Sequence, residues 1–129
     1  MSRMPLSSRR PGTTQGVRIA GKSVHLTVGF RDEEKTQVGE IFLVLSKTGA
    51  QERALFDEIA RSASHRLQLG EPLEELADGW LNTKMRPRGI VTGDDRIKMC
   101  QGPLDWAGRH LLINYCGRED LAHVKKETP

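Results

Sequence analysis

The stretch from Glu40 to Leu69 constrains the fold most, because a strand with two apolar faces runs directly into the longest helix that the sequence predicts. In Glu40–Ser46, three aliphatic side chains point one way, while Phe42 and Val44 point the other way. A strand of this kind needs cover on both sides. The predicted helix Ala50–Leu69 has apolar residues at every fourth position, and we expect this stripe to pack on the sheet. The stripe comprises Leu55, Ile59, Ala63 and Leu67, widened by Phe56 and Ala60.

Two further strands are predicted before this stretch, and two further helices after it. The strands are Val17–Ile19 and Ser23–Phe30, and in the second of them His25 and Thr27 face away from the apolar side. The helices begin at Pro72 and after Gly102-Pro103. Because the strands come first and the helices follow, the sequence predicts an α+β fold: an antiparallel sheet of about three strands, with about three helices packed on one face.

A length of 129 residues fits one domain. We expect a flexible basic tail over residues 1–16, an α+β domain over residues 17–124 and a short tail over residues 125–129. The tail to residue 16 has no apolar stretch of the kind found in signal peptides. The longest apolar run, Ile41–Leu45, is too short to span a bilayer, so no membrane partner is expected.

The net charge is +3 with a pI of about 9.1, which permits a nucleic-acid partner without implying one, and we expect no such partner. Cys100 and Cys116 lie in neither a CxxC nor a zinc-ligand pattern. They are typical of reduced thiols in a cytoplasmic protein. The four histidines lie on separate predicted elements without metal-ligand spacing, so the sequence predicts no metal site and no catalytic residue.

The turn Ser46–Gly49, between the third strand and the long helix, raises the question of phosphate binding. A helix N-terminus attracts anions, although a Walker motif is absent here and a glycine turn in this place is more often only a turn. Three cations in the later loop 84–93 could close over the same ligand, or could simply be solvated. The candidate phosphate-binding residues are Lys47, Thr48, Gly49, Arg53, Lys84, Arg86 and Arg88.

Four segments in fixed order resemble a known domain: GEIFLVLSKTGAQERALFDEIA, LQLGEPLEELADGWL, GDDRIKMCQGPLDW and GREDLAHV. Together they resemble the C-terminal TSCPD-type domain of vitamin B12-dependent (class II) ribonucleotide reductases. The resemblance runs from about Arg9 to Val124. It implies a fold and a pathway, namely deoxyribonucleotide synthesis for DNA replication.

The resemblance does not carry an activity to this sequence. The catalytic barrel that holds the radical cysteine, the cobalamin and the substrate in those reductases has no counterpart here. Neither Cys100 nor Cys116 matches a cysteine of their redox relay, and Ala50 stands where related domains often have cysteine. The chain is therefore expected to bind no cofactor, and to meet adenosylcobalamin only through a partner reductase.

Three functions remain open from the sequence. The first is a non-catalytic accessory or regulatory module that works with a reductase catalytic chain. The second is an independent module that binds or sequesters a small nucleotide, and the third is a protein-interaction or oligomerisation module. An apolar patch that stays exposed usually marks an interface, so a homo-oligomer, most simply a C2 dimer, is also predicted. The expected interface residues are His25, Thr27, Phe42 and Val44.

Overall fold

The computed structural model describes residues 3–46 and 49–125, and within them the chain has an α+β fold, as predicted. One antiparallel sheet has the strand order β3-β2-β1-β4-β5. The elements are β1 (Gly12–Ile19), β2 (Lys22–Phe30), β3 (Val38–Leu45), α1 (Ala50–Gln68), α2 (Leu73–Asp78), β4 (Gly89–Thr92), β5 (Met99–Cys100), α3 (Pro103–Tyr115) and a short 3-10 helix, η1 (Glu119–Leu121). In the described ranges, no helix is long and apolar enough to cross a membrane.

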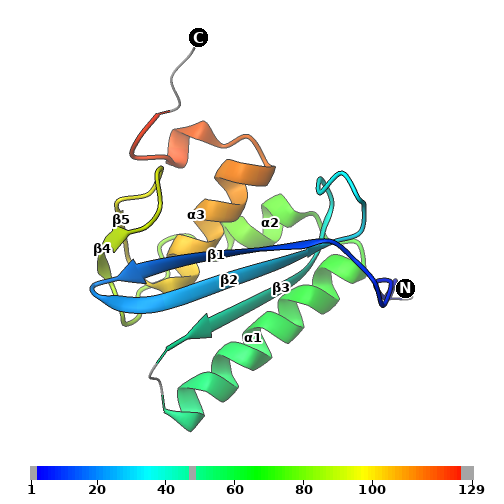
Figure 1. The fold of residues 1–129 in the computed structure, drawn as a ribbon, viewed down its shortest axis with the longest axis horizontal. Coiled ribbons are helices and arrows are strands. Elements are labelled where there is room, and N and C mark those ends of the chain that lie inside the picture. The colour runs from blue at the N-terminus through cyan, green and yellow to red at the C-terminus, as the bar shows by residue number, and fades with distance from the viewer. Residues whose placement is uncertain (1–2, 47–48, 126–129) are drawn as a thin grey trace. The chain divides into compact units, whose positions relative to one another are not determined.

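The chain divides into two compact units. The first comprises the described parts of residues 1–16 and 24–72, and the second comprises residues 17–23 and the described part of 73–129. In the first unit β2 pairs with β3, from Val24 opposite Leu45 to Phe30 opposite Val38, and α1 packs on β3 (Figure 1). Strand β1 begins at Gly12, five residues before the predicted start, because Pro11 and Thr14 already contact β2.

The buried face of α1 is rotated from the predicted one. Leu55 is 58% exposed and Ile59 is only partly buried, so the prediction was wrong for these two residues, whereas Phe56, Ala60, Ala63 and Leu67 are buried as predicted. The residues that α1 buries are Phe56, Ala60, Ala63, Ser64, Leu67 and Gln68. The rotation has a physical reason, because β3 is an edge strand and its outer polar groups need partners.

Two polar side chains of α1 supply those partners. The hydroxyl of Ser64 accepts a hydrogen bond from the Ile41 amide at 2.9 Å and donates one to the Ile41 carbonyl at 3.2 Å. The amide of Gln68 donates to the carbonyl of Gly39 at 3.1 Å. Ser64 and Gln68 are one helical turn apart, so both bonds fix the same helix face against the strand edge.

The second unit contains two strands that were not predicted. The stretch 84–93 was expected to be a loop, but Gly89–Thr92 forms β4, which pairs with the end of β1 and with β5. These strands have four and two residues, too few for a readable alternation of side chains. Helix α2 ends at Asp78, whereas the sequence predicts an end near Asn82-Thr83, and it packs on α3 (Figure 1). Gly108 permits that approach, because a Cβ there would lie 2.7 Å from the Ala77 carbonyl oxygen.

Two buried carboxylates organise the loops of the second unit. Asp94 accepts hydrogen bonds from the amides of Arg96 and Ile97 at 2.8 and 3.0 Å, and from the indole of Trp106 at 2.9 Å. Burial raises the pKa of Asp94, but hydrogen bonds from His110, the two amides and Trp106 outweigh it, so this pKa lies well below its usual range.

The other buried carboxylate, Asp105, joins two loops to α3. It accepts from the amides of Asn82 and Gln101 at 2.7 and 2.8 Å, and from Nε of Arg109 at 2.9 Å. Asp94 and Asp105 therefore hold the two ends of the segment 94–105 in place through hydrogen bonds to both of their carboxylate oxygens.

Candidate functional site

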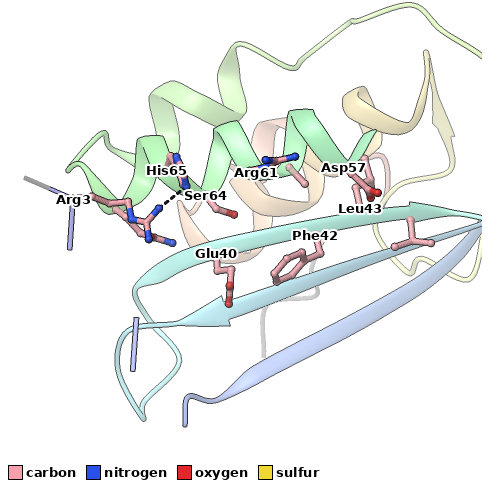
Figure 2. Close-up of a pocket in the computed structure, with 11 residues that line it drawn as sticks. Arg3, Glu40, Phe42, Leu43, Asp57, Arg61, Ser64 and His65 are labelled. Atoms are coloured by element: carbon pink, nitrogen blue, oxygen red, sulfur yellow. Dashed lines mark hydrogen bonds between the residues drawn. The ribbon is translucent and has the colours of Figure 1, made fainter. Parts of the chain in front are cut away.

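A groove of about 420 Å³ lies between α1 and β3 in the first unit (Figure 2). Its floor comes from β3, where Phe42 and Val44 are 45% and 51% exposed because they alternate with buried neighbours. One wall comes from α1, where Asp57, Arg61 and His65 follow one another at every fourth residue and therefore lie in one row. The groove thus combines an apolar floor with a charged wall.

The groove carries charges of both signs at its rim. Glu40 is held in place by Arg10, which contacts its two carboxylate oxygens at 2.6 and 2.8 Å. Toward the same end of the groove, on the side of α1, the Arg3 guanidinium makes a hydrogen bond with Nε2 of His65, drawn as the dashed line in Figure 2. An anchored carboxylate at one side and a guanidinium at the other can orient a polar partner over the apolar floor.

Ser64 lies in the wall of the groove, and its hydroxyl is engaged by both backbone polar groups of Ile41. Among the described residues, no group of three or more metal-ligating side chains is positioned to hold a metal ion.

The chain is similar to curated proteins over nearly its whole length. It is 42% identical over 123 residues to the vitamin B12-dependent ribonucleotide reductase of Agrobacterium fabrum. This match covers 95% of this chain and 9% of the reductase. It is 38% identical over 122 residues to the Bradyrhizobium diazoefficiens protein of the same name, covering 95% of this chain and 10% of that protein. Its identity to the Streptantibioticus cattleyicolor protein is 29% over 113 residues, covering 88% of this chain and 18% of that protein.

The chain is a relative of one small region of the vitamin B12-dependent ribonucleotide reductases. The family resemblance predicted from the sequence is thereby confirmed. The chain spans about a tenth of the length of the first two reductases, so their activity as whole proteins is not transferred by the similarity. No family model and no solved structure matches the chain.

Both cysteines of this reductase-related chain are in environments that disfavour the thiolate. Burial, together with the charge of Asp105, raises the pKa of Cys100, and two backbone hydrogen bonds offset this only in part. Burial and the charge of Glu74 raise the pKa of Cys116. A thiol whose pKa is raised stays protonated at neutral pH and is a poor nucleophile.

The residues predicted to bind phosphate fall in three places. Lys47 and Thr48 lie outside the described residues. Gly49 and Arg53 are exposed at the start of α1 in the first unit, whereas Lys84, Arg86 and Arg88 are exposed in the second unit. Gly49 is the N-cap of α1 and makes no side-chain capping bond. Phosphate binding at this turn stays a prediction.

The residues predicted to form an oligomer interface lie together on one face of the first unit. His25 is directly opposite Val44 in the β2–β3 ladder, and Thr27 is directly opposite Phe42. Phe42 also lines a second hollow of about 310 Å³ on its other side, which includes Arg10 and Thr27. Phe42 is therefore a protruding side chain between two hollows, although its role in an interface stays a prediction.

Sequence reasoning found the floor of the groove and missed its wall. The residues missed are Arg3, Glu40, Asp57, Arg61, Ser64 and His65. A signal was present, because Phe56, Ala60 and Ser64 also repeat at every fourth residue. Choosing this stripe would have turned the row Asp57, Arg61 and His65 toward Phe42. The predicted stripe included Phe56 and Ala60 but not the polar Ser64.

Proposed function

We propose that this chain is a non-catalytic accessory or regulatory module of a vitamin B12-dependent ribonucleotide reductase, acting in deoxyribonucleotide synthesis. The observation that carries the proposal is the 42% identity to a reductase over 95% of the chain. Identity of this degree over an entire folded region supports a shared structural role with the matching region of the reductase.

The local chemistry supports the non-catalytic part of the proposal. The hydroxyl of Ser64 is occupied within the fold, and the raised pKa values of Cys100 and Cys116 keep both sulfurs protonated. Ribonucleotide reduction needs a radical and a reducing dithiol, and these groups are poor candidates for either part. In this proposal adenosylcobalamin and substrate are bound by the catalytic chain, and the groove on α1 and β3 contacts that partner.

The test uses the Agrobacterium fabrum reductase in two forms, intact and with the region that matches this chain deleted. Ribonucleotide reduction is measured with adenosylcobalamin and a dithiol, with and without this chain added. We expect no turnover from this chain alone, binding to the shortened reductase, and a change in its turnover. Turnover by the chain alone that is lost in Cys100→Ser or Cys116→Ser would show the proposal to be wrong, and so would the absence of both binding and effect.

A matched pair of variants tests the groove itself. Phe42→Asp places a charge on the apolar floor, whereas Leu55→Asp changes another exposed apolar side chain, which lies outside the groove lining. We expect only Phe42→Asp to weaken binding to the shortened reductase, because buried apolar anchors carry most interface energy. Equal binding by both variants would remove the groove from the proposal.

The same groove face favours a second candidate, a protein-interaction module that pairs with its own copy. Phe42 stands between two hollows, so two copies related by a twofold axis could each place Phe42 in a hollow of the other. The rim carries both Arg61 and Asp57, and such a mixture of charges can complement itself.

A further inference from the structure

The second unit contains three segments that are rich in cations and have no carboxylate. Residues 17–23, 84–93 and 97–101 hold six Lys or Arg side chains and no Asp or Glu. All six are exposed. They are Arg18, Lys22, Lys84, Arg86, Arg88 and Lys98. For a chain whose net charge is only +3, this is a strong concentration of positive charge.

The backbone places these three segments side by side. Arg18 is opposite Thr92 in the β1–β4 ladder, and the amide of Ala20 donates to the carbonyl of Ile90 at 2.9 Å. Beyond β4, Ile90 is opposite Met99 of β5. The amide of Met85 donates to the carbonyl of Gln101 at 3.1 Å, so the loop with the basic residues continues along β5.

Alternation along these strands creates an outer face with an apolar centre. Val17, Ile19, Val91 and Cys100 point inward and are buried. Arg18, Ile90 and Met99 alternate with them, and Ile90 and Met99 are 65% and 58% exposed. Because Ile90 and Met99 are directly opposite each other, they form one contiguous apolar spot rather than two isolated side chains.

The six cations of these segments are not neutralised within the part of the fold that the structure describes. Over residues 3–46 and 49–125, none of the six forms an ion pair within 4.0 Å. Of the neighbouring carboxylates, Asp94 and Asp105 are buried and engaged by amides, Trp106 and Arg109, whereas Asp95, in the turn between β4 and β5, is exposed. Lys98 donates to the backbone carbonyl of Asp94 rather than to a carboxylate.

We propose that this face, where Ile90 and Met99 are exposed among three segments that carry six unpaired cations, binds an acidic protein segment that carries an apolar anchor. Charge complementarity favours an acidic partner. The exposed Ile90–Met99 spot favours a partner that also carries an apolar side chain to cover it. The three segments contain no aromatic residue, whereas surfaces that bind single-stranded nucleic acid stack bases on aromatic side chains. The inference is independent of the proposed function, because it concerns a different unit and does not require the partner to be a reductase.

The test is fluorescence anisotropy on the full chain with three labelled probes. The first is a short glutamate-rich peptide with leucine at every fourth position, the second replaces those leucines with serine, and the third is oligothymidylate. We expect the first probe to bind most tightly and its affinity to fall as salt rises, because the contacts include exposed charges.

Two double variants separate the charged and apolar contributions. The charged variant combines Arg18→Glu with Arg88→Glu, and the apolar variant combines Ile90→Ser with Met99→Ser. Each should lower the affinity for the leucine-containing peptide about tenfold or more. The apolar double variant should leave the serine-containing peptide unchanged. A matched control, Arg9→Glu with Lys35→Glu, makes the same change in net charge on exposed side chains of the first unit and should have little effect. Circular dichroism confirms that each variant is folded.

Three results would overturn the proposal. The first is that neither peptide binds. The second is that the Arg18/Arg88 variant and its control lower the affinity for the leucine-containing peptide equally. The third is tighter binding of oligothymidylate than of the leucine-containing peptide, with the same dependence on Arg18 and Arg88, which would assign the face to nucleic acid.

Discussion

Replacing Asp94 with Asn should destabilise the second unit strongly, although the two side chains have almost the same shape. One carboxylate oxygen of Asp94 accepts from the amides of Arg96 and Ile97, and the other accepts from Trp106. An Asn has a single acceptor oxygen, so its NH₂ group must face at least one of these donors. A hydrogen bond to a charged group is worth about 1.5–3 kcal/mol, and leaving a buried donor unpaired adds about 1–3 kcal/mol. The expected loss is therefore about 3–5 kcal/mol.

The assay is urea unfolding followed by tryptophan fluorescence. Trp80 and Trp106 are both in the second unit, so the signal reports on the part of the chain that the substitution affects. Asp95→Asn is the matched control, because it makes the same chemical change at the next residue, which is exposed. The control should alter the free energy of unfolding by less than about 0.5 kcal/mol.

The pH dependence gives a second check on the same carboxylate. Because the pKa of Asp94 is lowered in the folded state, the unfolded chain binds more protons between the two pKa values, and stability rises with pH there. The contribution of Asp94 is therefore complete above its unfolded pKa of about 3.9, and it is lost as pH falls toward the folded pKa. The stability difference between Asp94→Asn and the unchanged protein should be constant near neutral pH and should shrink below about pH 4.

The reasoning fails if Asp94→Asn and Asp95→Asn unfold at the same urea concentration at neutral pH. That result would mean that the hydrogen bonds to Asp94 are replaced by water at no cost. A difference that stays undiminished below about pH 4, where the protein is still folded, would show that the charge of Asp94 is not its cause.

Three further predictions concern the first unit. Phe56→Ala should cost about 3–5 kcal/mol in chemical unfolding followed by circular dichroism, whereas Leu55→Ala should cost less than about 1 kcal/mol, and comparable losses would contradict the observed helix face. If the Phe42 face pairs two copies, light scattering should show a dimer that Val44→Asp converts to a monomer, and a monomeric mass for the unchanged protein would exclude that interface. If the start of α1 binds nucleotide phosphates, calorimetry with ATP or dATP should show binding whose affinity falls as salt rises and in the Arg53→Ala variant. The absence of a binding heat with every nucleotide would contradict this prediction.

The sequence by itself determined the fold class and the family relationship. The order of strands and helices depends on local periodicity, which is visible in any window of the chain, so β2, β3, α1 and α3 were placed within a few residues. The exposed row on β3 was also predictable, because side chains on a strand must alternate whichever partner the strand has. Phe42 and Val44 could therefore be assigned to one face before the structure was known.

Only the tertiary structure decided how the buried face of α1 departs from the predicted stripe, where β4 and β5 lie, and which of two adjacent aspartates is buried. Each of these depends on a partner distant in the sequence. Ser64 turns inward because the edge of β3 needs a hydrogen-bonding partner, and Gly89–Thr92 becomes a strand because the end of β1 lies beside it. Asp94 rather than Asp95 is buried because Trp106, twelve residues later, offers it a donor. A local pattern cannot encode these choices, because the energy that decides them comes from satisfying polar groups on another element.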